Sequence, residues 1–293
     1  MTGVLFSLAS GDIMQRATLV GAAVFITGTL ACAVPGHAQA TVGADLGLFS
    51  SYVWRGLSLT NKPVAQPDLY VTFPAGKASI TLGGWANIDL GKYDDPNDDL
   101  SESGGSSAFN FAEFDPWAEV SYTVGKATLT GGATAYIYPN DFGFTKDLNT
   151  VEIYGKASLD TPLSPKVSIY YDVDKVKGAY IEGGVSYSLA ASEKVSVDLG
   201  ALAGFSAGQG FNASDESANF ADNGFTHLDI SAGVPLTAGV LSITPVLHLV
   251  IAGDDATKIT SPTNTSDAKL WGGVSISWSN AAEEEEAPAA TTE

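Results

Sequence analysis

From Thr41 onward the sequence alternates apolar and polar residues with a period of two, and few folds can use such a pattern along a whole chain. Side chains of a β-strand point alternately to its two faces, so each alternating segment predicts a strand with one apolar and one polar face. Helical periodicity with end caps appears nowhere in this region. The segments have the approximate limits 43–57, 66–74, 77–90, 109–124, 126–139, 148–159, 165–175, 178–190, 194–206, 225–235, 239–252 and 269–279.

Short turns and long polar loops alternate between these segments for most of the chain. Gly125, 191–193 and 236–238 are examples of the short connections, and 91–108 and 253–268 are examples of the long ones. Outer-membrane barrels have short turns on the periplasmic side and long loops outside, and an even strand count returns both ends to the periplasm. A soluble β-sandwich has no reason to sort its loops in this way. We therefore predict an all-β fold, a transmembrane up-and-down antiparallel β-barrel of about 12 strands over residues 41–280, with a soluble all-β fold as the alternative.

The apolar faces of these segments can all be phased so that they carry no charge. A lipid-facing surface requires this, because an Arg or Lys near the middle of the bilayer costs about 2–4 kcal/mol. Aromatic residues fall near two levels of these faces, as in the interfacial girdles of membrane barrels. Those expected toward the loop end are Tyr52, Trp54, Phe114, Tyr171 and Phe205, and those toward the turn end are Phe73, Tyr122, Tyr187 and Trp278.

The N-terminal segment 1–40 is typical of a secretory signal peptide, with a basic residue, an apolar run and the small-residue sequence Ala38-Gln39-Ala40. Met14 is an alternative start, because the residues before it add nothing to the basic region. Acylation of Cys32 as a lipoprotein is the rival interpretation, but Leu30 lies one place too close to the cysteine. Cleavage after Ala40 leaves a chain without cysteine, so disulfides are excluded and export to the outer membrane of a Gram-negative bacterium is expected.

Charge excludes one class of partner and marks the C-terminal end. Lys and Arg number 14 against 33 Asp and Glu, and a net charge of −19 repels phosphate backbones, so no nucleic-acid binding is expected. The low-complexity residues 281–293 predict a disordered acidic tail. Outer-membrane barrels commonly end on an aromatic residue that the barrel-assembly machinery recognises. Here the tail follows Trp278, so 274–278 would act as an internal closing strand.

The polar faces would line the lumen, and most of their ionisable side chains are acidic. The candidates for setting selectivity are Arg55, Asp89, Glu113, Asp115, Glu119, Glu152, Lys156, Asp172, Glu182, Asp198, Asp229 and His248. A narrow passage of low dielectric constant focuses the field of its wall charges and concentrates ions of the opposite sign. The sequence therefore favours a passive channel for small cations or neutral solutes in contact with outer-membrane lipids. The alternative is a structural or adhesive barrel in which these carboxylates pair with Arg55 and Lys156 and fill the lumen.

Two other kinds of site receive little support. The acidic stretch 93–102 superficially resembles a calcium loop, but it lacks the EF-hand order of ligands and is interrupted by Pro96, which favours a solvated loop. An outer-membrane lipid-modifying enzyme would need a serine activated by a base. Only His227 and His248 follow the signal segment. The Gly-x-Ser-x-Gly sequence at 204–208 lies at the end of the predicted strand 194–206 with no helical segment after it, so it does not form a nucleophile elbow. We expect no catalytic residues, cofactor or metal.

The most specific motif is Ser51-Tyr-Val-Trp-Arg-Gly-Leu-Ser-Leu-Thr60, followed by Pro63-Val-Ala-Gln-Pro67. It resembles the first hairpin of the TorF-like porin family of proteobacteria, and the match lies mainly in residues 50–67. The resemblance implies an outer-membrane barrel with porin function and no catalytic residues. In that setting Arg55 would face the lumen among carboxylates, while Gly56 would permit a bend or bulge at the rim. A role of the motif in folding or strand closure is an equal alternative, and the oligomeric state is not predicted.

Overall fold

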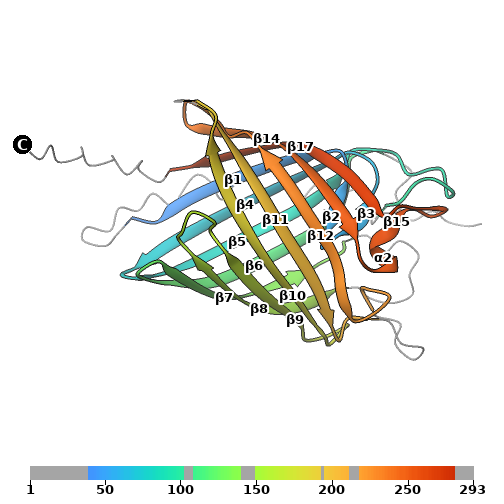
Figure 1. Ribbon diagram of the computed structural model, residues 1–293, viewed down its shortest axis with the longest axis horizontal. Helices are drawn as coiled ribbons and strands as arrows, with labels where there is room; N and C mark the ends of the chain where they lie inside the picture. The colour runs from blue at the N-terminus through green and yellow to red at the C-terminus, as the bar shows by residue number, and fades with distance from the viewer. Residues whose placement is uncertain (1–38, 102–107, 140–148, 193–194, 211–217, 281–293) are drawn as a thin grey trace, which may run out of the picture. The chain divides into compact units, whose positions relative to one another are not determined.

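The computed structural model describes residues 39–101, 108–139, 149–192, 195–210 and 218–280, so the predicted acidic tail and nearly all of the predicted signal peptide lie outside the described residues. Within the described part, one antiparallel sheet runs along the whole chain (Figure 1). Its strands are β1 (Thr41–Phe49), β4 (Val64–Ala75), β5 (Ala78–Asp89), β6 (Asn110–Val124), β7 (Ala127–Tyr136), β8 (Thr150–Leu159), β9 (Lys166–Asp172), β10 (Ala179–Ala190), β11 (Ser196–Ala207), β12 (Gly224–Gly233), β13 (Leu236–Ala238), β14 (Leu241–Ala252) and β17 (Ala268–Ser279).

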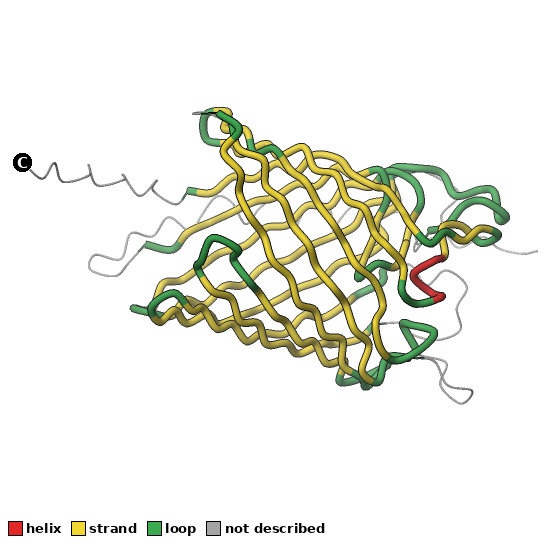
Figure 2. Tube along the Cα trace, viewed as in Figure 1, coloured by secondary structure: helices red, strands yellow, loops and turns green. Residues whose placement is uncertain are grey.

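The sheet closes on itself into a barrel. Each long strand pairs with the next long strand along the chain, and the last one, β17, pairs with both β14 and β1. The three-residue β13 belongs to the turn between β12 and β14, which also pair directly. Twelve described strands therefore form a closed up-and-down antiparallel barrel, which confirms the predicted fold (Figures 1 and 2).

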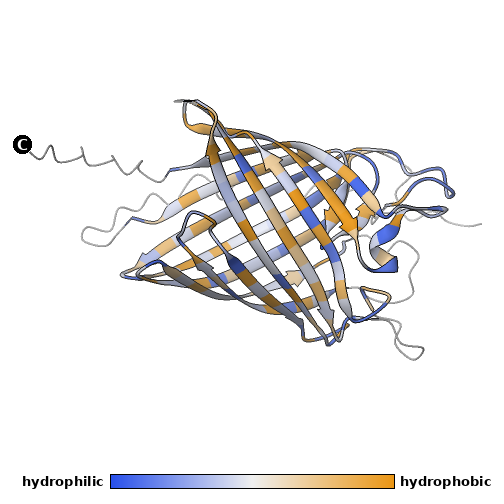
Figure 3. Cartoon of the chain, in the orientation of Figure 1, coloured by the Kyte–Doolittle hydropathy of each residue, from blue (hydrophilic) through white to orange (hydrophobic). Residues whose placement is uncertain are grey.

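Apolar and polar residues alternate along the barrel strands (Figure 3), and the exposed fractions show that the wall is apolar outside and polar inside, as the alternation predicts. Leu82 on β5 and Ile153 on β8 have exposed fractions of 47% and 51%, whereas Glu113 and Glu152 on the inner face are buried at 1% and 2%. This inversion of the usual protein interior is suited to a surrounding of lipid. Among the described residues no helix is long and apolar enough to cross a membrane.

The two ends of the barrel differ in their connections. Gly76 and Gly125 have φ values of +69° and +59° in the tight turns after β4 and β6, where a side chain would be strained. The other end carries the long connections, including a four-residue helix α2 (Asp255–Lys258) and a small hairpin of β15 (Ile259–Ser261) and β16 (Asn264–Thr265). We call these the turn end and the loop end.

The prediction of one continuous strand over 43–57 is wrong beyond Phe49. Phe49 is opposite Val64 of β4, so the barrel wall continues directly from β1 to β4 and the residues between them leave the wall. They form β2 (Tyr52–Trp54) and β3 (Leu57–Thr60), which pair only with each other. We call residues 50–63 the inner hairpin, because its contacts lie with side chains of the inner face.

The same departure corrects part of the predicted loop-end girdle. Tyr52 is buried and bonds Glu113 of the inner face, and Trp54 packs at 6.1 Å between ring centroids against Tyr136, so neither faces lipid. The period-two pattern continues through the hairpin, which is why the sequence assigns both rings to the outer surface. The remaining girdle residues, Phe114, Tyr171, Phe205, Phe73, Tyr122, Tyr187 and Trp278, are exposed, at 36–45% of their surface.

Candidate functional site in the barrel lumen

The tip of the inner hairpin is a two-residue turn made by Arg55 and Gly56. Trp54 and Leu57 pair across it, and the φ values of Arg55 and Gly56 are +50° and +80°. Positive φ at both central residues is the requirement of a type I′ turn, whose twist matches that of the paired strands. An arginine in the left-handed region is uncommon and needs tertiary contacts to hold it.

Those contacts are made by a carboxylate on β8. The Arg55 guanidinium donates from Nη1 to Oε1 of Glu152 at 2.8 Å and from Nη2 to Oε2 at 2.6 Å, and the two side chains are only 7% and 3% exposed. The hydroxyl of Tyr136 donates a further hydrogen bond to Oε2 of Glu152 at 2.8 Å. A bidentate pair of this kind fixes both distance and orientation, which a lysine could not do.

Aromatic rings surround the same guanidinium. Its central carbon lies 4.2 Å from the ring centroid of Trp54 and 4.5 Å from those of Tyr170 and Tyr180. Within this distance the negative faces of aromatic rings attract a cation, more strongly where water is excluded. Glu152, Trp54, Tyr170 and Tyr180 form what we call the Arg55 cage.

The opposite side of the hairpin is held by β17. Lys269, which is 8% exposed, donates from Nζ to the carbonyl oxygen of Gly56 at 2.5 Å and to Oγ of Ser58 at 3.0 Å. The wall runs in the order β17-β1-β4-β5-β6-β7-β8, so β17 and β8 lie opposite each other in a barrel of twelve described strands. The inner hairpin therefore crosses the lumen from one wall to the other.

Gly56 is required at the tip for space as well as conformation. A Cβ added to it would lie 2.5 Å from Cγ of His227, which is buried on β12. The hairpin thus packs against a third part of the wall.

Several predicted selectivity residues near the loop end are buried and hold loops in place. Asp89 accepts hydrogen bonds from Asn87 and Ser101, and Asp172 accepts from Thr150 and from the backbone of the loop after β9, including the amide of Val176. Their carboxylates stabilise the loop end of the wall. Asp115 is likewise buried, at 6% exposure, on the inner face of β6.

The turn-end half of the lumen has partly exposed polar groups. Glu119 accepts hydrogen bonds at Oε2 from the Tyr154 hydroxyl at 3.0 Å and from Lys156 Nζ at 3.3 Å, with the Glu119 and Lys156 side chains 22% and 39% exposed. Nearer the loop end, on β10, Glu182 accepts a long hydrogen bond of 3.4 Å from the Tyr170 hydroxyl and is partly exposed. These groups are accessible to water, in contrast to those around Arg55.

Inward-facing aromatic side chains in this half lie against glycines of the adjacent strand. A Cβ on Gly83 would overlap the Trp117 indole, and one on Gly132 would overlap the Tyr154 ring. Rings that cover a neighbouring glycine lie along the wall instead of extending toward the axis. If the glycines carried side chains, the rings would have to move toward the barrel axis. With glycine at these positions the rings fill less of the centre of the lumen.

His248 occupies a separate part of the wall. Its Nδ1 lies 3.0 Å from Oδ1 of Asp229, and its ring stacks on Trp271 with centroids 4.1 Å apart. Asp198 is exposed on β11 near the turn end. The structure therefore divides the predicted residues into separate groups: Arg55 with Glu152, Glu119 with Lys156, and Asp229 with His248.

Sequence reasoning missed Lys269 and the aromatic residues of the Arg55 cage. Lys269 opens the last predicted strand, where it reads as a loop residue. The rings of Tyr170 and Tyr180 occupy polar-face positions, so the alternation places them inside, but their grouping around one cation depends on the fold of the hairpin. A positively charged residue next to a glycine inside a predicted strand is the signal that could have indicated the turn.

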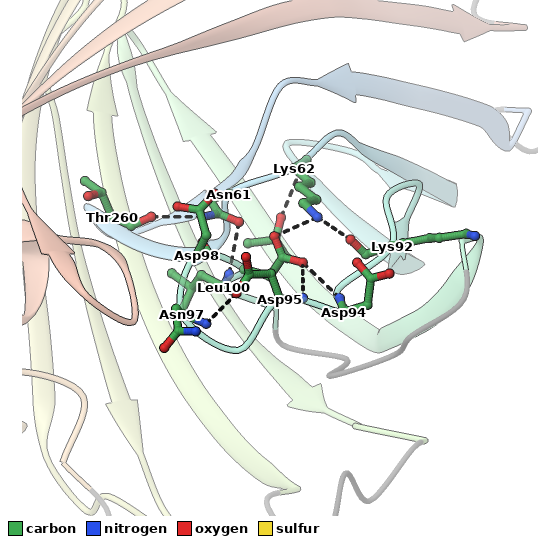
Figure 4. Close-up of polar contacts among 11 residues, drawn as sticks. Asn61, Lys62, Lys92, Asp94, Asp95, Asn97, Asp98, Leu100 and Thr260 are labelled. Atoms are coloured by element: carbon green, nitrogen blue, oxygen red, sulfur yellow. Dashed lines mark hydrogen bonds and ion pairs between the residues drawn. The ribbon is translucent and has the colours of Figure 1, made fainter.

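Loops of three connections meet at the loop end (Figure 4). Lys62 Nζ lies 2.7 Å from Oδ1 of Asp99, and Oδ2 of Asp99 accepts hydrogen bonds from the amides of Asp94 at 2.9 Å and Asp95 at 3.0 Å. These contacts hold the pKa of Asp99 below its usual range, and the hydrogen bond from Lys62 has the largest effect. Asn61 joins the same group to the carbonyl oxygen of Thr260 at 3.2 Å. We call this group the loop cluster.

The loop cluster explains the acidic stretch that resembles a calcium loop. The Asp99 carboxylate forms an ion pair with Lys62 and accepts hydrogen bonds from backbone amides. The Asp95 carboxylate accepts a hydrogen bond from the backbone amide of Asn97. Within the described ranges no group of three or more His, Cys, Asp or Glu side chains is arranged to hold a metal ion.

Comparison with solved structures supports the architecture. An outer-membrane channel from Pseudomonas putida F1 has a TM-score of 0.50 and 9% sequence identity, covering 84% of this chain and 99% of that one. LpxR from Salmonella typhimurium has a TM-score of 0.46 at 9% identity, covering 81% and 99%, and the NanC porin has 0.42 at 10%, covering 82% and 99%. The fold assignment rests on the first of these. No protein-family model matches the chain, and no curated protein matches it as a relative.

Proposed function

We propose that this protein is a porin-like channel of a Gram-negative outer membrane, through which small solutes diffuse passively with a preference for cations. The observation that carries the proposal is the contrast within one lumen. Partly exposed charges line the turn-end half, and a single hairpin held by Arg55, Glu152 and Lys269 crosses the other half. A wall of polar groups leading to a local constriction is the arrangement expected of a selective diffusion channel.

The preference for cations follows from which of the partly exposed charges in the lumen remain unneutralised, since Lys269, without an ion pair in the described part of the chain, is buried beneath the hairpin. Arg55 pairs with Glu152 and Lys156 pairs with Glu119, so these two basic side chains are used within the wall. Glu182 and Asp198 have no ion pair among the described residues and are partly exposed or exposed. A negative wall in a narrow passage concentrates cations and repels anions.

The proposal includes the remaining expectations from the sequence. The chain would mature at residue 41, insert with the barrel-assembly machinery into outer-membrane lipids, and belong with the TorF-like porins whose first hairpin it resembles. No enzymatic activity is proposed. Nδ1 of His248 is hydrogen-bonded to Asp229, but among the described residues no serine or threonine hydroxyl is hydrogen-bonded to the same ring.

A structural barrel with a closed lumen is the second candidate, and the burial of the Arg55–Glu152 pair favours it. Planar-bilayer conductance of refolded residues 41–293, with a salt gradient to give the reversal potential, separates the two. Discrete steps with cation selectivity are expected. Anion-selective steps would keep the pore and refute the charge assignment, whereas no steps from protein shown to be folded by heat-modified gel mobility would favour the closed barrel.

A further inference from the structure

Two cationic side chains at the inner wall, Arg55 and Lys156, are bound in the same way, whereas Lys269 is bound by a carbonyl and a hydroxyl oxygen. Arg55 lies between three aromatic ring faces and the carboxylate of Glu152. Lys156 Nζ lies 4.3 Å from the ring centroid of Tyr154 and 3.3 Å from Oε2 of Glu119. A ring face together with a carboxylate therefore holds each of these two side-chain cations at the inner wall.

The rings that make these contacts form a continuous row. Tyr154 is the register partner of Tyr170, and Tyr170 is the register partner of Tyr180. The ring centroids are 5.7 Å apart in the first pair and 6.2 Å apart in the second. The row begins at the exposed Lys156 side of the lumen and ends at the buried Arg55 cage.

One carboxylate beside this row has no cation. Glu182 accepts the long 3.4 Å hydrogen bond from Tyr170 and, among the described residues, forms no ion pair. It lies on β10 two residues from Tyr180, and its neighbours across the strand pairs are Ser168 and Gly204, neither of which is charged. Glu182 thus repeats the carboxylate of the two occupied sites without the cation.

We propose that Tyr154 and Tyr170 with Glu182 form a binding site for small organic cations that carry a guanidinium or primary ammonium group. These three side chains are partly exposed, whereas the Tyr180 ring is fully buried between Arg55 and Phe220 and closes the row. The inference deepens the proposed function by naming a substrate class, and it rests on that function. The chemistry favours such cations over neutral sugars, because a carboxylate repeatedly accompanies the ring faces and because the two side chains already bound there are an arginine and a lysine. A solute on this row would lie next to the Arg55 cage that holds the tip of the inner hairpin.

The test compares two solutes of nearly the same shape, methylguanidinium and the neutral methylurea. In planar bilayers carrying potassium current through the mature chain, methylguanidinium should reduce the current at concentrations about tenfold below those at which methylurea acts. Glu182→Gln should weaken that block about tenfold while potassium still passes. Asp160→Asn, which removes one charge in the exposed turn after β8, is the matched control and should leave the block unchanged.

Calorimetric titration of both solutes into folded protein in detergent gives a readout that does not need conduction. Binding of methylguanidinium that Glu182→Gln weakens would support the site even if no current is found, in which case only the channel would be refuted. Equal binding of the two solutes, or binding that Glu182→Gln leaves intact, would overturn the inference. A cation-selective current without methylguanidinium block or binding would also overturn it and leave the proposed channel standing.

Discussion

Arg55 shows how much depends on one residue in this lumen. Its charge is buried and its backbone lies in the left-handed region. Among the described residues, its guanidinium forms the ion pair that joins the hairpin tip to β8. Burying a charge is costly unless it is paired and hydrogen-bonded, so Arg55 and Glu152 can be stable there only together.

Replacing Glu152 by Gln should therefore destabilise both the hairpin and the barrel. The amide cannot neutralise the buried guanidinium, and breaking a buried pair from one side costs about 3–5 kcal/mol. We expect a lower urea midpoint of unfolding in detergent, followed by tryptophan fluorescence, and more frequent current fluctuations in bilayers. Asp160→Asn serves as the charge-matched control, and equal midpoints for the two variants would contradict a structural role of the pair.

Gly56 gives a second prediction at the same scale. Gly56→Ala places a side chain where φ is +80° and where its Cβ would meet the His227 ring. The left-handed conformation alone costs about 1–2 kcal/mol. The variant should unfold at lower urea, whereas Gly76→Ala in an exposed turn, with open space around its Cβ, should show only the conformational part. If Gly56→Ala lowers the free energy of unfolding no more than Gly76→Ala does, the contact with His227 is unimportant for stability.

At the scale of elements, the inner hairpin is separable from the wall. Phe49 and Val64 are register partners, so a two-residue Asn-Gly turn can join β1 to β4 in place of residues 50–63. The shortened chain should fold as a barrel with a higher single-channel conductance, because the segment that crosses the lumen is gone. An unchanged conductance step in protein with heat-modified gel mobility would mean that the narrowest point lies elsewhere.

The loop cluster should respond to acid. Because the folded pKa of Asp99 lies below its unfolded value of about 3.9, its contribution to stability is present above that pH and is lost as the pH falls through the folded pKa. Hydrogen exchange at the Leu100 amide, which is bonded by Asn61, should thus accelerate only below about pH 4. Asp99→Asn should remove this acid step, and Asp255→Asn on α2 should retain it. An acid step that survives in Asp99→Asn would assign it to another carboxylate.

The sequence predicts strands well and the hairpin poorly, for a physical reason. The alternation indicates which face of a strand contacts lipid. The barrel strands are therefore predicted to within a few residues wherever one face is apolar. The inner hairpin has the same period of two but no lipid-facing side, and Arg55-Gly56 is the only local signal that distinguishes it from β1. The partners of Arg55 and Gly56, Glu152 and Lys269, come from opposite walls, and such pairings depend on closure of the whole barrel.

At the scale of the whole molecule, the two faces of the wall should differ in their tolerance of charge. Leu82 lies in the middle of β5, is 47% exposed and is opposite Val71 and Ala118. Leu82→Arg should reduce the free energy of unfolding of the barrel in lipid vesicles by about 2–4 kcal/mol, because the guanidinium would enter the hydrocarbon. Ser231→Arg, in the turn-end part of β12 and opposite His248 on the inner face, is the comparison variant and should cost less than Leu82→Arg.

The comparison has a further readout, because the two arginines carry the same charge into different surroundings. Ser231→Arg adds positive charge to the passage and should shift the reversal potential in a salt gradient away from cation selectivity, whereas Leu82→Arg should leave the selectivity of any folded channels unchanged. If Leu82→Arg folds into vesicles as readily as Ser231→Arg, the outer face is not in contact with hydrocarbon. If Ser231→Arg leaves the reversal potential of a conducting channel unchanged, the inner face of β12 does not line the path of the ions.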